Sequence, residues 1–238
     1  MSKRFLVLLM VFSSYAMAAS KPTVTPPMAP RGGALAIPDD TYDGTTASMA
    51  CLTTAGPGGA ITDMSVDIDL EHTWAGDLVI KVVAPDTTTL TLQSRAGFAE
   101  PADDGTGGFG DSSDYQAGNT ITFINGGATS AEDAGSNIPG TDFICATDGL
   151  CSYAPFPDQG PGTDFTDFTG MESAGNWMVC IGDSGAGDTG NFISSNINFT
   201  VAAVLAPPTQ VPSLSFYGIL LMMGLLISMM VYRQKRRA

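Results

Sequence analysis

Apolar and polar residues alternate with a period of two along the middle of this sequence, a pattern typical of β-strands with one buried face. The longest run covers residues 64–70, and similar runs cover 78–83, 89–93, 121–123, 177–181 and 196–201. Turn-forming Pro-Asp, Asn-Gly-Gly and Gly-Asp sequences separate the runs. No helical apolar stripe of useful length precedes residue 214. Many short strands between glycine-rich turns predict an all-β domain built as a β-sandwich.

The charge distribution excludes several classes of protein. The chain has 24 acidic and 10 basic residues, a formal net charge of −14, and every acid lies between Asp39 and Asp188. Such an acidic chain is not a nucleic-acid binder, and 44% hydrophobic residues exclude a disordered chain. Because His72 is the only histidine, a histidine-based metalloenzyme is disfavoured as well.

Residues 1–19 have the pattern of a secretory signal peptide. Lys3 and Arg4 precede an unbroken apolar run over residues 5–12, and Ala16-Met17-Ala18 supplies small residues for cleavage. Residues 20–38 are rich in Pro, Ala and Thr, which predicts a tether. We therefore expect the folded region, residues 39–205, to be secreted across the inner membrane.

The C-terminal region has the pattern of a membrane anchor. Residues 206–213 form a short Pro-containing linker, and residues 214–232 carry no charge and are long enough to span a bilayer as a helix. The basic end, residues 233–238, follows at once, and the positive-inside rule predicts that it stays in the cytoplasm. The sequence thus predicts one C-terminal transmembrane helix, which makes the membrane a partner.

The end of the linker resembles the IPTL-type C-terminal sorting signal of bacteria, a Pro-containing motif followed by a hydrophobic helix and an Arg-rich end. The matching residues are Val211, Pro212, Leu214, Ser215 and Gly218. Residues 216–217 are Phe-Tyr, where this signal usually has Glu-Trp. The resemblance implies a sorting and processing machinery in the cell envelope of a Gram-negative bacterium. An ordinary C-terminal anchor is the alternative.

A second resemblance lies in the domain itself. Residues 66–78 combine an alternating strand with the motif His-Thr-Trp-Ala-Gly-Asp-Leu and resemble the P domain (P/Homo B domain) of proprotein convertases and subtilisin-like proteases. Further segments of the same pattern are 84–86, 94–97, 168–170, 175–177 and 187–190. The resemblance implies a jelly-roll β-sandwich. It also implies structural roles for His72, Thr73, Trp74, Gly76, Asp77, Leu78, Trp177, Gly187, Asp188 and Gly190.

The sequence does not predict an enzyme. The resembled family carries its catalytic Asp, His and Ser in a subtilisin-like domain ahead of the P domain, where only a signal peptide and a tether are expected here. Residues 182–185, Gly-Asp-Ser-Gly, match the nucleophile segment of chymotrypsin-like proteases. That chemistry needs a histidine beside the serine, and His72 lacks the sequence context of that family. We expect residues 183–185 to form a turn and His72 to be a structural residue at a strand end.

The four cysteines fit an oxidising compartment and allow three disulfide pairings. Cys145 and Cys151 are close in sequence, in a loop that contains Asp-Gly. Cys51 precedes the first core strand, and Cys180 lies in the strand that contains Trp177. The pairing Cys51–Cys180 with Cys145–Cys151 is therefore favoured. A metal site is the alternative, but the spacing lacks the paired cysteines of a zinc knuckle.

Calcium is the candidate cofactor, since carboxylates in glycine-rich loops are ligands that calcium prefers. The candidate ligands are Asp77, Asp103, Asp104, Asp111, Asp114, Asp183 and Asp188, with Asp103 and Asp104 as the preferred pair. No EF-hand spacing is present. A solvated acidic surface is the alternative explanation for these residues, and Asp77 has a structural alternative beside a tight glycine turn.

These features predict a secreted, envelope-anchored P-domain module without catalytic activity, which serves surface display or protein interaction. The alternative is an accessory subunit. Since a P domain normally packs on a subtilisin-like serine endopeptidase and stabilises it, this one would serve a separate protease.

Overall fold

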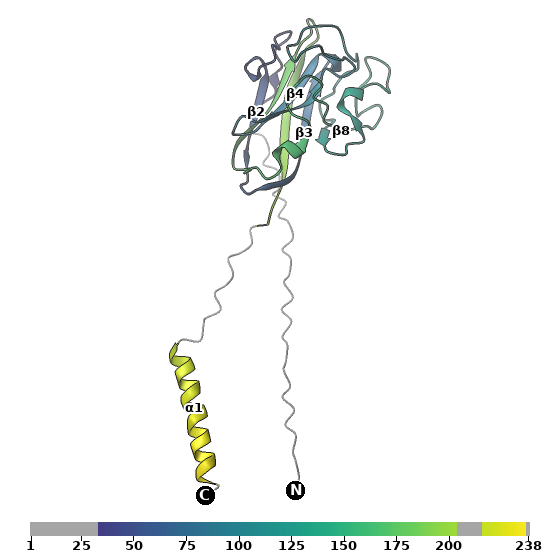
Figure 1. The fold of residues 1–238 in the computed structure, drawn as a ribbon. Helices are drawn as coiled ribbons and strands as arrows, with labels where there is room; N and C mark the ends of the chain where they lie inside the picture. Colours follow the sequence, from purple (N-terminus) through teal and green to yellow (C-terminus); the bar gives the residue numbers. More distant parts are fainter. Residues whose placement is uncertain (1–32, 204–215, 237–238) are drawn as a thin grey trace. The chain divides into compact units, whose positions relative to one another are not determined.

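The computed structural model describes residues 33–203 and 216–236, which belong to two separate units (Figure 1). The first unit is mostly β. Its strands are β1 (Leu35–Ala36), β2 (Ala50–Gly56), β3 (Ile61–His72), β4 (Leu78–Val83), β5 (Thr89–Ser94), β6 (Ile121–Ile124), β7 (Thr129–Ser130), β8 (Ser152–Ala154), β9 (Gly175–Asp183) and β10 (Gly190–Val201). Four single 3-10 turns interrupt the loops: η1 (Thr46–Ser48), η2 (Ala75–Asp77), η3 (Ala131–Asp133) and η4 (Phe165–Phe168).

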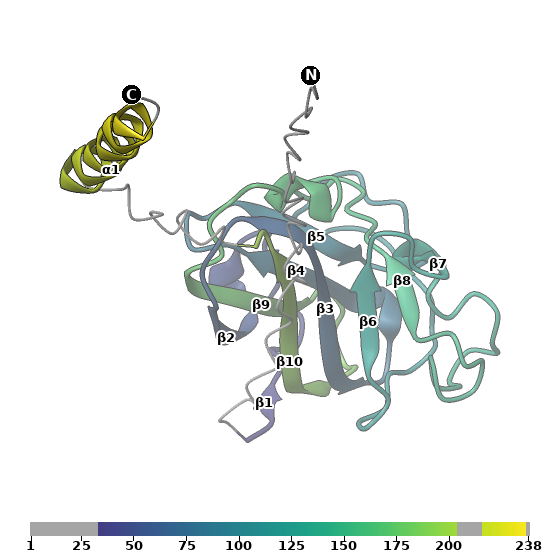
Figure 2. The same cartoon turned by 90° about the horizontal axis from the view of Figure 1, so that it is seen from below.

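The strands form two sheets that pack as a sandwich, as the alternation predicts. One sheet has the order β1-β10-β3-β6-β8-β7 and the other β2-β9-β4-β5 (Figure 2). The longest pairing is antiparallel, between β3 and β10, and runs from His72 opposite Gly190 to Ile61 opposite Val201. Val66, Ile68 and Leu70 of β3 are buried in the core between the sheets.

Strand β4 departs from the alternation that its sequence shows. All six of its residues are buried, including Lys81, which is 2% exposed. Tyr42 and Met49 precede β2 and pack on Val79 of β4 in a small second core. The outer face of the four-stranded sheet is therefore covered at this point, which a period of two within β4 does not reveal.

Both disulfides have the favoured pairing. Cys51 and Cys180 are directly opposite each other in the β2–β9 ladder, and their sulfur atoms are bonded. Cys145 is bonded to Cys151, and the bond closes the loop before β8. Two disulfides indicate an oxidising, extracytoplasmic location.

The edge strand β1 lies in the stretch that we expect from sequence to be a tether. Leu35 pairs with Phe192 and Ala36 with Asn191, so the six-stranded sheet begins before residue 39. A strand of two residues is too short to show an alternation. The expected signal peptide lies outside the described residues, as does the tether before residue 33.

The second unit contains the helix α1 (Phe216–Lys235). Within residues 33–203 and 216–236, no helix is long and apolar enough to cross a membrane, so the prediction of a transmembrane helix over 214–232 is wrong. The described helix extends beyond residue 232 and includes Arg233 and Lys235 in its last turn. Of the expected sorting motif, Gly218 lies in α1, whereas Val211, Pro212, Leu214 and Ser215 lie outside the described residues.

Candidate functional site

The motif that follows β3 builds one end of the sandwich, around His72. The imidazole is fully buried, and its Nε2 lies 3.1 Å from Oδ2 of Asp183 at the end of β9. The backbone N–H of Trp74 lies 3.1 Å from Nδ1. If Nδ1 accepts this bond in the neutral ring, Nε2 carries the proton and donates to Asp183. Both ring nitrogens are thus used inside the domain.

The turn after β9 packs on a second buried carboxylate, that of Asp77. Asp77 is 3% exposed, and its Oδ1 has no hydrogen-bond partner among the described residues. A Cβ at Gly185 would overlap this carboxyl group, so only glycine allows the turn to pack here. Burial and then the charge of Asp183 raise the pKa of Asp77 to about 6.

The other motif residues serve the same construction. Thr73 donates from Oγ1 to Asp188 at 2.9 Å and accepts from the backbone N–H of Thr189 at 3.2 Å. Gly76 donates its N–H to the carbonyl of Asp111 at 2.8 Å. Leu78 and Trp177 are fully buried. The N–H of Gly187 donates to Asp39 at 3.0 Å, and the carbonyl of Gly190 accepts from the backbone N–H of Ile37, just after β1, at 3.1 Å.

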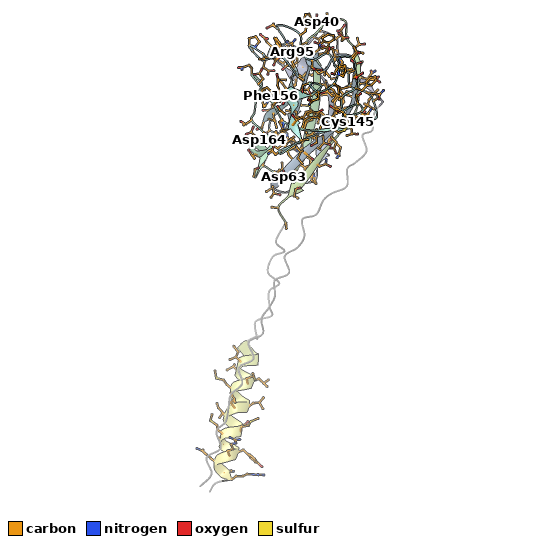
Figure 3. All side chains as sticks on the ribbon, turned by 90° about the vertical axis from the view of Figure 1, so that its right-hand side faces the viewer. Asp40, Asp63, Arg95, Cys145, Phe156 and Asp164 are labelled. Atoms are coloured by element: carbon orange, nitrogen blue, oxygen red, sulfur yellow. A yellow bond between two sulfur atoms is a disulfide. The ribbon has the colours of Figure 1, made fainter. Side chains whose placement is uncertain are left out.

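Arg95 is a central residue to which the sequence assigned no role of its own, although it lies in the segment 94–97 that resembles the P-domain pattern. It is 1% exposed and follows β5 at the same end of the sandwich as Asp40 (Figure 3). Its guanidinium donates to the carbonyls of Gly76 at 3.3 Å and Thr106 at 3.2 Å, and also to those of Gly105 and Gly108. Arg95 therefore joins the motif loop to the loop over residues 105–108.

Ser184 does not form a catalytic arrangement with His72. Its Oγ is buried without a hydrogen-bond partner in the described part of the chain. It faces residue Gly105, since a Cβ there would lie 3.3 Å from this oxygen. The Nε2 of His72, which would have to accept the serine proton, is bonded to Asp183 instead.

The candidate calcium ligands do not meet in one place. Asp103 forms an ion pair with Lys81 at 2.7 Å, while Asp104 and Asp111 accept backbone N–H groups within their own turns. Asp114 lines the groove that is described below. The contacts of the other three candidate ligands, Asp77, Asp183 and Asp188, are given above. No group of three His, Cys, Asp or Glu side chains in the described ranges could hold a metal ion. Calcium binding therefore stays a prediction.

A groove of about 620 Å³ opens beside this end of the sandwich. Its walls come from β1, the end of β3, the start of β10 and the segment around Asp114. Glu71 and Asp114 supply carboxylates, and Phe143, which is 37% exposed, supplies an aromatic wall. The sequence predicted none of this as a groove, because its walls are far apart along the chain.

One comparison with known protein families agrees with the resemblance seen in the motif. Residues 61–115 match the family described as proprotein convertase P-domain. No curated protein is significantly similar to this chain. Two crystal structures from Aeromonas sobria are similar: the serine protease with the chaperone ORF2, at 15% identity over 77% of this chain, and the serine protease alone, at 14% over 79%. The TM-score is 0.41 for each, and the match covers 28% of each of those chains, so this chain spans less than a third of their length.

Proposed function

We propose that this protein is a non-catalytic, extracytoplasmic P-domain module that binds another protein. The observation that supports it most directly is the use of both ring nitrogens of His72 inside the domain. The motif residues hold loops together, and the surface beside them offers a groove with carboxylate and aromatic walls. This combination suits recognition of a partner rather than a chemical step.

Affinity purification from the native host, read by mass spectrometry, tests this function. The tag belongs directly after the expected signal peptide, so that it survives processing. We expect stoichiometric recovery of at least one envelope or secreted protein. Recovery of the bait alone under mild cross-linking would contradict the proposal. The bait's own C-terminal peptide would show at the same time whether the tail is processed.

The second candidate is an accessory role for a separate subtilisin-like serine endopeptidase. The match of residues 61–115 to the proprotein convertase P-domain family favours it. In the same purification, stoichiometric recovery of such a protease would support this role, and purified protein should then raise the melting temperature of that protease. Recovery of other envelope proteins alone would count against it.

Calcium would stabilise the folded state if a native site exists. The test is the melting temperature with calcium and with a chelator. A shift of more than about 1 °C would support calcium binding, and a smaller shift would argue against a structural site.

A further inference from the structure

Between residues 33 and 203, the surface has no exposed basic side chain. All 24 acids of the chain lie in this part, and its only lysine and arginine are Lys81 and Arg95. These two are 2% and 1% exposed, and His72 is buried as well. Lys81 is also paired with Asp103. The surface of residues 33–203 therefore carries ionised side chains of one sign, which attract cationic partners.

Asp114 brings this charge into the groove without a partner of its own. Its carboxylate makes no hydrogen bond or ion pair with the described residues, unlike that of Glu71, which accepts from Nδ2 of Asn191 at 2.7 Å. Partial burial and the nearby charge of Asp188 raise the pKa of Asp114. Both effects oppose ionisation of Asp114, and a bound cation would offset both.

Phe143 gives the groove a wall of different chemistry. Its ring is 37% exposed and lines the same groove as Asp114. Asp114 and Phe143 lie side by side, because they form an isolated parallel β-bridge. Lys and Arg side chains have an apolar stem and a charged head, and their head groups also bind aromatic faces. An aromatic wall beside a carboxylate fits both parts of such a side chain.

Within residues 33–203, the groove also meets an unpaired edge of the six-stranded sheet. β1 is the edge strand of the six-stranded sheet, and Ala36 of β1 lines the groove. An edge strand can pair with an extended segment of another chain through backbone hydrogen bonds. The groove is thus placed to receive a side chain of a segment that runs along β1.

We propose that this groove binds a lysine or arginine side chain of an extended basic segment in a partner protein. Asp114 pairs with the cationic head, and Phe143 packs against the stem. The inference rests on the proposed function as an interaction module and adds the chemistry of the partner.

The test is fluorescence anisotropy with the full-length protein and a fluorescein-labelled pentapeptide, Gly-Arg-Gly-Lys-Gly. A peptide with Glu in place of both cations is the control ligand. Asp114→Asn is expected to weaken binding of the basic peptide about tenfold, and Phe143→Ala several-fold. Asp63→Asn is the matched control variant, because Asp63 is exposed at the other end of the sandwich (Figure 3) and should bind as the wild type does.

Three results would overturn the proposal. One is no binding of the basic peptide at low salt, where exposed charges act most strongly. Another is equal weakening by Asp63→Asn and Asp114→Asn, which would mean attraction by surface charge alone. The third is loss of binding in Phe109→Ala but not in Asp114→Asn, since Phe109 is 80% exposed and does not line the groove. Melting temperatures equal to the wild type would show that the variants are folded.

Affinity purification with the Asp114→Asn variant separates this proposal from the proposed function. Loss of the partner that the wild type recovers supports the groove as its site. Equal recovery by both proteins would overturn the groove proposal and leave the interaction module standing. No partner with either protein would contradict the proposed function itself.

Discussion

His72 and Asp183 form a fully buried pair that joins the two sheets of the sandwich, with 3.1 Å between Nε2 and Oδ2. His72 ends β3 in the six-stranded sheet, and Asp183 ends β9 in the four-stranded sheet. The second carboxylate oxygen of Asp183 accepts the backbone N–H of Gly185 at 2.9 Å. The pair therefore fixes both sheets and the turn after β9 at the end that carries the groove.

Removal of His72 should destabilise the domain strongly. His72→Ala leaves the Asp183 carboxylate buried without its partner, and such a loss costs about 3–5 kcal/mol of unfolding free energy. Urea unfolding measures the loss. Thr73→Ala is the control, because its hydrogen bonds with Asp188 and Thr189 are exposed and are worth only about 1 kcal/mol each. Equal losses of unfolding free energy in the two variants would show that the buried His72–Asp183 pair stabilises the domain no more than an exposed hydrogen bond does.

The stability of the domain should fall as the pH rises from about 4 to 7. The pKa of Asp77 is raised to about 6 by burial, and that of Glu132 to about 7, also mainly by burial. The folded state therefore binds more protons than the unfolded chain in this window, and ionisation at higher pH removes that stabilisation. Thermal melting across this pH range measures the slope. An increase of stability from pH 4 to 7 would contradict the raised pKa values of Asp77 and Glu132.

Asp77→Asn isolates the contribution of one group. The variant cannot ionise at this position, so its pH slope between about 4 and 6 should be shallower, and at pH 7 it should be about 2 kcal/mol more stable than the wild type. Asp63→Asn, an exchange at an exposed position, should keep the wild-type slope. An unchanged slope in Asp77→Asn would mean that other carboxyl groups cause the pH dependence.

The alternation in the sequence predicted the sandwich because its long strands have one buried face. Val66, Ile68 and Leu70 of β3 show this directly. The disulfide between Cys51 and Cys180 was predictable for a related reason, since each cysteine lies in or beside a core strand. The resemblance to the P-domain motif over residues 72–78 implied structural roles for these residues, and Gly76 and Asp77 lie in η2, between β3 and β4.

The site depends on contacts that leave no local pattern. Lys81 has the position of a solvent-facing residue in β4, but it is 2% exposed because its Nζ lies 5.1 Å from the centre of the Tyr42 ring and pairs with Asp103. His72 and Asp183 are 111 residues apart, and neither neighbourhood indicates the other. For the same reason, the sequence did not show that Asp103 pairs with Lys81 while Asp77 lies near Asp183. The number of acidic residues gives the net charge of the chain. A calcium site also needs several oxygen ligands around one point, and the sequence does not show which carboxylates come together in the fold.

The two disulfides should differ in their effect on stability. The Cys51–Cys180 bond spans a sequence separation of 129, and its removal in Cys51→Ala/Cys180→Ala should cost about 5 kcal/mol on the chain-entropy model. The Cys145–Cys151 bond spans a separation of 6, and its removal should cost about 2 kcal/mol. Urea unfolding of the two double variants measures both values. The reverse order would show that strain or packing outweighs the entropy of the unfolded chain.

Arg95→Lys should loosen one loop more than the domain as a whole. The planar guanidinium of Arg95 reaches carbonyls on two separate segments, those of Gly76 and of residues 105–108, and a lysine ammonium cannot reproduce this fork. The carbonyls left without a donor should cost about 1–3 kcal/mol of unfolding free energy. Hydrogen exchange read by mass spectrometry should show faster exchange over residues 103–111, while the β3–β10 ladder keeps its protection. Asp63→Asn should change neither region. Arg95 holds the loop by donating to backbone carbonyls of the loop. If hydrogen exchange in Arg95→Lys were accelerated equally in both regions, Arg95 would act through the core and not through these carbonyls.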